Sequence, residues 1–451
     1  MWHAPGTGSG ARVDWDGAVA MDETTRRAVA RPPDHSSAPW PHRDLDVGAL
    51  RRSGVGPVPF RQFVLKMHSR CNLDCSYCYV YHGSDDSWRS RPPRPAERVL
   101  RQTAYRIAEH VRAHRQTDIR IDLHGGEPLL AGSGRLVRCV SLVRAAVAEA
   151  SDGGCRVHAA VQTNGTLLTE PIIEELAAAD IRIGVSLDGG IPQANARRTD
   201  HAGRPSWDRT VRGLELLTRY PEVYAGILAT IDLGQDPQAV YTSLLRFAPP
   251  SMDFLLPHAN WSSPPPGSDG RSTPYGDWLA AVFDRWFDAA GYETGIRLFS
   301  QIIALLVGLP SATEAVGTSP AATMVIETDG AGEQVDSLKV AYRNGPATGL
   351  DVFGSSFDDA LELPGFTARQ IGVAALSKTC GDCPVVAVCG GGNYAHRYLA
   401  GRGFDQPSVY CADLERIIRH VAARLATVNP GSAAPPVIGS ITAPWDIVPN
   451  T

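Results

Sequence analysis

The sequence contains 451 residues, of which 43 are basic and 48 acidic, giving a net charge of -5. A chain of this length exceeds what one hydrophobic core usually holds, so two domains are expected. The negative charge argues against a nucleic-acid or anionic-membrane partner. No uninterrupted apolar run approaches the length of a membrane span. The first ten residues lack the parts of a signal peptide, and nine cysteines without an export signal point to metal binding in a reducing cytoplasm.

Residues 1–57 are rich in Pro, Gly, Arg and Asp and are expected to form a flexible N-terminal segment with one short helix at 46–52. From residue 58 onward, apolar runs of strand length alternate with helical patterns. The expected strands are 63–67, 119–123, 156–162, 181–187, 224–231 and 252–256, and the expected helices are 96–111, 134–149, 170–179, 206–218 and 237–247. Six such units predict an α/β fold, a partial (β/α)6 TIM-like barrel over residues 58–258, with a complete eight-unit barrel as the alternative.

Three cysteines follow the first expected strand at a C-x3-C-x2-C spacing: Cys71, Cys75 and Cys78. Thiolates in one short loop select sulfur-loving centres, foremost iron-sulfur clusters. A cubane with four irons and three local thiolates keeps one iron open for a small molecule. A zinc loop or three buried thiols are the alternatives.

The ends of the next three strands also carry polar residues and glycines. The second strand ends at Gly125, Gly126 and Glu127, the third at Asn164 and the fourth at Ser186. Adjacent glycines allow the backbone to approach a ligand closely. Parallel α/β folds place their chemistry at the carboxyl ends of strands, so these residues should lie beside the cysteine loop.

The cysteine spacing, with Tyr77 just before the third cysteine, and the Gly-Gly-Glu-Pro turn resemble the radical S-adenosylmethionine (SAM) superfamily. The resemblance implies a SAM-binding [4Fe-4S] cluster whose open iron chelates SAM. It assigns SAM contacts to Tyr77, Gly125, Gly126, Glu127, Asn164, Ser186 and Arg198. Arg198 would pair with the SAM carboxylate, although Arg197 competes for this role and a solvated surface charge is the alternative.

A second cysteine set lies near the C-terminus: Cys380, Cys383, Cys389 and Cys411. Four thiolates leave no open metal position, which suits a saturated [4Fe-4S] cluster or a tetrahedral zinc, and spacing does not separate the two. The pattern resembles the SPASM extension, which carries auxiliary clusters in radical SAM enzymes that modify peptides. The expected divisions are 259–317 for a linker and helices, 318–425 for this SPASM-like domain and 426–451 for a C-terminal tail.

The chain departs from the SPASM pattern at the ligands of one cluster. Val335 and Asn393 stand where the resemblance expects cysteines. We therefore predict one auxiliary cluster rather than two, with Cys139 and Cys155 as spare thiols. Asp336, beside Val335, matches the aspartate that acts as a base in sulfatase-maturing relatives, and a turn-capping carboxylate is its alternative.

Residues 59–81, followed by Ser87-Trp88-Arg89, resemble the radical SAM branch that matures peptides ending in Phe-x-Ser repeats. This resemblance implies an oxidoreductase that acts on a ribosomally made precursor peptide. It would join an aromatic ring carbon to the Cβ of a nearby residue, forming a cyclophane, with electrons from a donor such as flavodoxin or ferredoxin. Formylglycine formation and thioether crosslinking are the competing oxidations. A non-enzymatic iron-sulfur or zinc module is the distant alternative.

Overall fold

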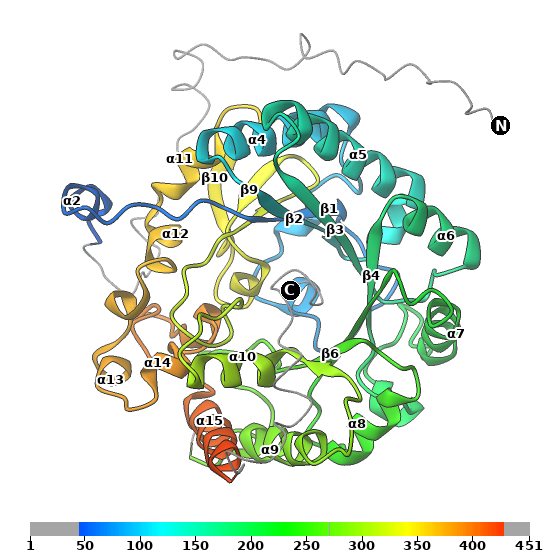
Figure 1. The fold of residues 1–451 in the computed structure, drawn as a ribbon, viewed down its shortest axis with the longest axis vertical. Coiled ribbons are helices and arrows are strands. Elements are labelled where there is room, and N and C mark those ends of the chain that lie inside the picture. Colours follow the sequence, from blue (N-terminus) through cyan, green and yellow to red (C-terminus); the bar gives the residue numbers. More distant parts are fainter. Residues whose placement is uncertain (1–44, 270, 428–451) are drawn as a thin grey trace, which may run out of the picture.

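The computed structural model describes residues 45–269 and 271–427. Its strands form one ten-stranded sheet in the order β10-β9-β8-β1-β2-β3-β4-β5-β6-β7, curved around the centre of the view in Figure 1. The strands are β1 (Gln62–His68), β2 (Asp118–Gly125), β3 (Arg156–Thr163), β4 (Ile181–Ser186), β5 (Tyr224–Thr230), β6 (Ser251–Leu255), β7 (Gly295–Ile296), β8 (Thr323–Ile326), β9 (Ala331–Glu333) and β10 (Ala347–Asp351).

Long helices surround the sheet (Figure 1). They are α4 (Glu97–His114), α5 (Ser133–Ala150), α6 (Glu170–Ala178), α7 (Trp207–Leu217), α8 (Pro237–Leu245), α9 (Pro274–Phe287), α10 (Arg297–Leu306) and α15 (Cys411–Ala426). The short helices are α2 (Val47–Arg52), α3 (Tyr79–His82), α11 (Phe357–Leu361), α12 (Pro364–Ala368), α13 (Lys378–Gly381) and α14 (Val386–Cys389). The 3-10 turns include η4 (Pro128–Ala131), η6 (Asp336–Val340) and η8 (Tyr394–Arg397).

Strands β1 to β6 pair in parallel in chain order, which confirms the predicted parallel α/β fold. All seven residues of β1 are buried, as expected for a strand covered on both faces. The helix predicted at 46–52 is confirmed as α2, whereas residues 1–44 of the expected flexible segment lie outside the described chain.

The C-terminal half adds strands to the same sheet. β8 pairs in parallel with the edge of β1 opposite β2, and β9 and β10 follow in antiparallel pairing. Residues 323–351 therefore continue the sheet that the barrel strands begin. This pairing brings the turn η6, which follows β9, close to β1.

The last described helix fastens the C-terminal half to the barrel. The carboxylate of Asp413 in α15 accepts hydrogen bonds from the backbone N–H groups of Tyr275 and Gly276, both at 2.9 Å. It thereby satisfies donors at the N-terminus of α9, which have no partners within their own helix. This contact holds α15 beside α9, and Cys411 at the start of α15 is placed with it.

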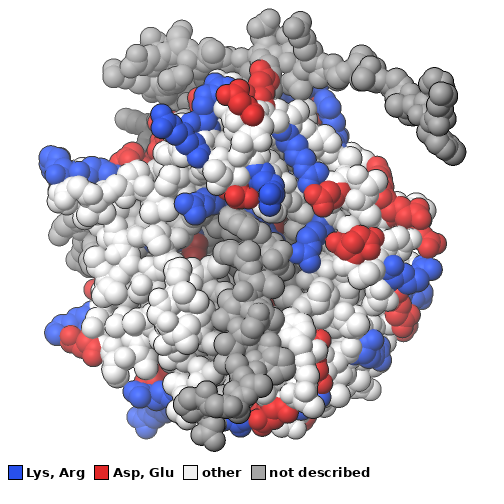
Figure 2. Space-filling view, viewed as in Figure 1, with Lys and Arg blue, Asp and Glu red and all other residues white. Residues whose placement is uncertain are grey.

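The outer surface mixes both charge signs. Figure 2 shows Lys and Arg side chains interspersed with Asp and Glu on the face in view. Within the described part of the chain, no helix combines the length and apolar character that a membrane crossing requires.

Candidate functional site

A cavity of about 280 Å³ lies at the carboxyl ends of the strands. Its walls come from three places: the cysteine loop, the ends of β2 to β6, and the C-terminal half. They include Cys71, Cys75, Tyr77, Cys78, His124, Gly125, Gly126, Gln162, Asn164, Ser186, Arg198, His258, Val335, Asn393 and His396. The structure thus brings the first cysteine set and six of the seven predicted SAM contacts to one site.

The cysteine loop presents its three thiols to this cavity. Cys71 Sγ receives hydrogen bonds from the backbone N–H of Leu73 at 3.3 Å and from Asn164 Nδ2 at 3.7 Å. Burial raises the pKa of Cys71 to about 12, and burial also raises the pKa values of Cys75 and Cys78. A metal centre would therefore displace protons from these thiols on binding. Amide donors aimed at sulfur fit a thiolate-ligated cluster.

The glycine pair at the end of β2 lets two backbone segments approach closely. Gly126 N–H donates to the carbonyl of His68 at 2.8 Å, and a Cβ on Gly125 would lie 2.3 Å from the same oxygen. Gly125 also has φ of +148°, which strains any residue with a side chain. The glycines therefore fix the end of β2 against the segment that leads from β1 into the cysteine loop.

Glu127 holds the neighbouring strand end instead of lining the cavity. Its carboxylate accepts hydrogen bonds from Thr163 Oγ1 at 2.7 Å, from Asn164 N–H at 2.8 Å and from Leu129 N–H at 3.0 Å. The side chain is fully buried. Its predicted place in SAM binding is thus best understood as positioning Asn164, whose side chain reaches Cys71.

One wall contains a hydrogen-bonded chain of Arg198, Tyr77 and Asp188, in which Tyr77 is half-buried and the other two are buried. Arg198 Nη1 donates to the Tyr77 hydroxyl at 2.7 Å, and that hydroxyl donates to the Asp188 carboxylate. Arg198 is 7 % exposed, so the surface-charge alternative is wrong for this side chain. Arg197 is more exposed and pairs with Asp232 at 3.2 Å.

Two buried polar atoms on this wall have no protein partner within the described ranges: Arg198 Nε and Gln162 Oε1. The other end of the Gln162 amide donates to Ser186 Oγ at 2.9 Å. An unpaired buried donor and acceptor are costly unless a ligand satisfies them. Beside three thiols, they fit a cluster-bound ligand with carboxylate and amine groups, which is what SAM offers.

Asp336 lies in a buried group of charges next to the cavity. Its carboxylate accepts a hydrogen bond from Lys66 of β1, and Lys66 Nζ also lies 3.2 Å from His124 Nδ1. Burial by itself would raise the pKa of Asp336, but the charges of Lys66 and Lys339 outweigh it and lower the pKa to about 2. The residues on either side of Asp336 line the cavity, whereas Asp336 does not.

Lys339 fills the centre of an adjacent acidic group. Its Nζ lies 2.9 Å from Glu333, 3.2 Å from Glu327 and 3.8 Å from Asp336. These three carboxylates lie close enough together to hold a metal ion, but the ammonium already pairs with all of them. The group is therefore a buried ion network that holds η6 to β8 and β9.

The second cysteine set lies in the C-terminal half. Cys380 belongs to α13, Cys389 ends α14 and Cys411 begins α15, while Cys383 lies between α13 and α14. Two short helices, the segment between them and one long helix therefore contribute to this group, and none of the four thiols comes from the barrel strands.

The loop after Cys389 is firmly placed. The carbonyls of residues 390–392 accept three hydrogen bonds from the Arg397 guanidinium, at 2.8 to 3.0 Å. Gly390 has φ of +61°, and a Cβ there would lie 1.7 Å from the Gly317 carbonyl oxygen. Only glycine permits this approach. The position of Cys389 is fixed from the C-terminal side as a result.

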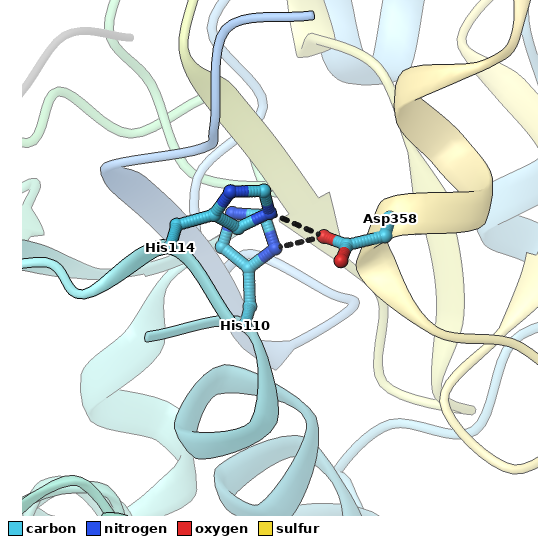
Figure 3. Close-up of side chains that lie close together, drawn as sticks. All are labelled: His110, His114 and Asp358. Carbon is cyan, nitrogen blue, oxygen red and sulfur yellow. Dashed lines mark hydrogen bonds and ion pairs between the residues drawn. The ribbon is translucent and has the colours of Figure 1, made fainter. Parts of the chain in front are cut away.

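A further group with metal-type ligands lies outside the cavity. His110 and His114 of α4 both point to Asp358 of α11, at 2.6 and 2.9 Å (Figure 3). His110 Nε2 accepts a hydrogen bond from Phe60 N–H at 3.0 Å, so in the neutral ring the proton is on Nδ1. Burial lowers the pKa of His110 to about 4, which keeps the ring neutral. Because its Nδ1 carries a proton, His110 joins α4 to α11 rather than binding a metal.

The sequence did not lead us to predict a role for three residues near the cavity: Lys66, His258 and His396. Lys66 is a lone charge within an apolar run, which is itself a signal of a buried ion pair. His258 comes shortly after the end of β6, and parallel α/β folds place their functional residues at such carboxyl ends of strands. The Pro- and Ser-rich composition around His258 instead predicts a linker. His396 lies in a turn of the C-terminal half, and no local pattern marks it.

Residues 65–236 match the family model described as the Radical SAM superfamily. A serine-type anaerobic sulfatase-maturating enzyme from Klebsiella aerogenes is 25% identical over 370 residues, covering 79% of this chain and 87% of that protein. A cysteine-type anaerobic sulfatase-maturating enzyme from Clostridium perfringens is 25% identical over 281 residues, covering 60% of this chain and 73% of that protein.

The fold is shared with solved structures. Native anSMEcpe with bound AdoMet superposes with a TM-score of 0.66 at 22% identity, covering 81% of this chain and 98% of that one. Streptococcus suis SuiB bound to the precursor peptide SuiA gives a TM-score of 0.54 at 14% identity, covering 80% and 78%. The predicted α/β architecture is thereby confirmed beyond the matched domain.

The unpaired guanidinium nitrogen of Arg198 yields a binding prediction. Arg198→Ala should weaken SAM binding by roughly 10- to 100-fold, because a charge-assisted hydrogen bond contributes about 1.5–3 kcal/mol. Equilibrium dialysis of reconstituted protein with labelled SAM measures the loss. Arg197→Ala, at the more exposed neighbouring arginine, is the matched control and should bind as the wild type does. Equal affinity in both variants would exclude Arg198 from the SAM site.

Proposed function

We propose that the chain, whose residues 65–236 match the Radical SAM superfamily model, is a maturase that crosslinks a ribosomally made peptide. The crosslink would join an aromatic ring carbon to the Cβ of a nearby residue. One observation carries this proposal. A single cavity runs from the three thiols to Val335 and Asn393, so the space where relatives of this pattern hold cluster ligands is lined by ordinary side chains and is open to a substrate.

Radical SAM proteins use a [4Fe-4S] cluster and SAM, and we propose the same two cofactors for this domain. Cys71, Cys75 and Cys78 would hold the cluster, and the walls around Arg198 and Gln162 would hold SAM. When bound and reduced, this pair supplies a 5'-deoxyadenosyl radical that abstracts hydrogen from carbon. The chain's own contribution is to orient SAM, bury the reacting carbon and accept the proton that leaves the ring.

Solved relatives support a peptide as the substrate. They include SuiB bound to its precursor peptide SuiA and anSMEcpe bound to the Cp18Cys peptide. We propose a precursor peptide here as well, with reducing electrons from flavodoxin or ferredoxin. A reducing cytoplasm is the natural setting for thiolate-ligated clusters.

We propose one auxiliary [4Fe-4S] cluster at Cys380, Cys383, Cys389 and Cys411. The four thiols lie near one another. Burial and the charges of Cys380 and Cys383 raise the pKa of Cys411, and burial and the charges of Cys411 and Cys380 raise the pKa of Cys389. Four thiolates with no open position suit a saturated cluster, and tetrahedral zinc is the alternative.

Formylglycine formation is the second candidate function. It is favoured by the sulfatase-maturating relatives, one of which is similar over 79% of this chain. Val335 and Asn393 in place of ligand cysteines set this chain apart from the full auxiliary pattern, and the resemblance of residues 59–81 to the Phe-x-Ser branch favours the crosslink.

In this proposal, Asp336 acts in the step that removes a proton from the aromatic ring. With its pKa near 2 and Lys66 bound to it, the carboxylate is a weak base, and it does not line the cavity. We therefore propose that its negative charge stabilises a proton held by a neighbouring group that does line the cavity.

The metal content tests the cluster assignment. Anaerobically reconstituted protein should contain about eight irons, since two cubanes hold four each. The double variant Cys380→Ala, Cys383→Ala should lose about half of them and keep the SAM-binding cluster. Iron and zinc analysis by mass spectrometry measures both. About twelve irons, or zinc in equal amount to protein, would contradict the single auxiliary cluster.

The product tests the reaction. With a synthetic peptide that contains Phe-x-Ser and carries deuterium at the serine Cβ, deuterium should appear in 5'-deoxyadenosine. The peptide should lose one deuterium and one ring hydrogen per crosslink, with no atom gained, and it should resist fragmentation between the joined residues. A product of the same mass that reacts with hydrazines contains an aldehyde and would establish formylglycine formation instead.

Asp336→Asn tests the carboxylate. Hydrogen abstraction should persist, while crosslinked product per 5'-deoxyadenosine should fall by about 10²-fold or more, as for loss of an acid-base group. Because Lys66 loses its buried partner, the melting temperature must be measured alongside. Glu333→Gln is the matched control, since it removes another carboxylate from Lys339, and burial already raises the pKa of Glu333 to about 7. Unchanged product in Asp336→Asn would leave Asp336 with a structural role only.

A further inference from the structure

The half-buried His258 and the buried His396 face each other across the junction between the barrel and the C-terminal half. His258 Nδ1 and His396 Nε2 lie 3.2 Å apart. His258 lies in the segment that leaves the barrel after β6 ends at Leu255, and His396 lies in η8. Both line the cavity that contains the three thiols of the first cysteine set.

The pair is uncharged at neutral pH. Burial lowers the pKa of His258 to about 4, against the raising effect of Asp336. Burial also lowers the pKa of His396 well below its ordinary value, and the charge of Arg397 adds to this. A short contact between two neutral imidazoles requires one ring to donate N–H and the other to accept.

This arrangement leaves a free lone pair whichever ring donates. The donating ring has its proton in the shared hydrogen bond, so its other nitrogen is an acceptor. That nitrogen is either His258 Nε2 or His396 Nδ1. Neither atom has a hydrogen-bond partner among residues 45–269 and 271–427. A proton taken up at one end can pass along the shared bond to the other ring.

The surroundings hold the pair in place. The Tyr410 hydroxyl donates to the Pro257 carbonyl at 2.6 Å, beside His258 in the chain. The ring of Tyr410 also packs edge-on against His396, with centroids 5.0 Å apart. The ring of Tyr79, next to the cysteine loop, packs in the same way against His258 at 4.6 Å. The pair is therefore fixed beside the loop that would carry the SAM-binding cluster.

We propose that the His258–His396 pair is the base that takes the proton from the aromatic ring during crosslinking. This inference rests on the proposed function. The radical at the substrate Cβ adds to a ring carbon and forms the new C–C bond. The C–H bond at that ring carbon then breaks, its proton goes to the free imidazole nitrogen, and one electron goes to an oxidised iron-sulfur centre. The substrate loses two hydrogens in total, and no atom is gained.

A neutral histidine suits this step better than Asp336 does. Regaining aromaticity makes the ring proton strongly acidic, so a weakly basic imidazole is sufficient. Asp336 is bound by Lys66 and lies behind the cavity wall. Its charge raises the pKa of His258 and so favours the imidazolium that forms there. Asp336 is thus a positioning residue for the pair, which is the group in contact with substrate.

Two variants separate the proposed base from its structural role. His258→Asn keeps a polar group at the Nδ1 position, and His396→Gln keeps one at the Nε2 position, so each preserves the contact between the two side chains. His258→Asn removes Nε2 of His258 and His396→Gln removes Nδ1 of His396, so the two variants together test both candidates for the free lone pair. His158→Asn, near the amino end of β3 and so away from the strand ends that form the cavity, is the matched control. The substrate is the Phe-x-Ser peptide with deuterium at the serine Cβ.

At least one of the two variants should transfer deuterium to 5'-deoxyadenosine as the wild type does, while its yield of crosslink falls by about 10²-fold or more. An iron content equal to that of the wild type shows that a variant keeps its fold. One variant that meets this condition is enough for the test. Wild-type crosslink yield from both variants would overturn the role of the pair and leave the proposed function standing. A hydrazine-reactive product from the wild-type enzyme would instead overturn the proposed function, and the pair's role with it.

A readout that needs no turnover comes from the rings themselves. Nitrogen NMR of protein with labelled histidine should show both rings of the pair neutral at pH 7, and His258→Asn and His396→Gln assign the two signals. A ring of the pair that is charged at this pH could not accept the proton, and that result would also overturn the role of the pair.

Discussion

The site depends on how closely the end of β2 approaches the exit of β1. The carbonyl of His68 accepts a hydrogen bond from Gly126 N–H, and it lies where a side chain at Gly125 would have to be. Only a residue without Cβ permits this contact. Since the cysteine loop follows His68 directly, the contact fixes where all three thiols enter the cavity. The Glu127 carboxylate accepts a hydrogen bond from the backbone N–H of Asn164, just after the end of β3, and the Asn164 side chain donates to Cys71 Sγ. These two bonds fix the end of β3 relative to the cysteine loop.

A second constraint comes from charge buried beside the first. Lys66 is opposite His124 in the register of β1 and β2, and its ammonium contacts both His124 and Asp336. Breaking a buried ion pair typically costs about 3–5 kcal/mol, so η6 is held tightly against β1. The same pairing makes Asp336 a poor proton acceptor. Its charge remains useful, because it favours a proton on His258.

The cavity that results has two walls of different chemical character. One wall, with the thiols, Arg198 and Gln162, offers sulfur ligands and unpaired polar atoms to a cluster and its ligand. The other wall comes from the C-terminal half and includes Glu314 as well as neutral side chains, with Val335 and Asn393 where the resemblance expects cluster ligands. In the proposed function, a radical formed at the first wall meets a substrate held against the second.

Local patterns in the chain were enough to predict the parallel strands and the three thiols, whereas the residues predicted to contact SAM came from the resemblance to the radical SAM superfamily. The parallel strands follow from apolar runs that alternate with amphipathic helices, and the cysteine spacing and the glycine pair are equally local. Six of the seven residues predicted to contact SAM line the cavity. Glu127 does not, because its position is visible in the sequence but its buried hydrogen bonds are not. Only the tertiary structure determines which titratable side chains lie in contact with each other. Lys66 and Asp336 are 270 residues apart, and His258 and His396 are separated by 138. Such contacts arise from the pairing of β8 with β1 and from the packing of the C-terminal half on the barrel, and no local pattern of residues encodes them.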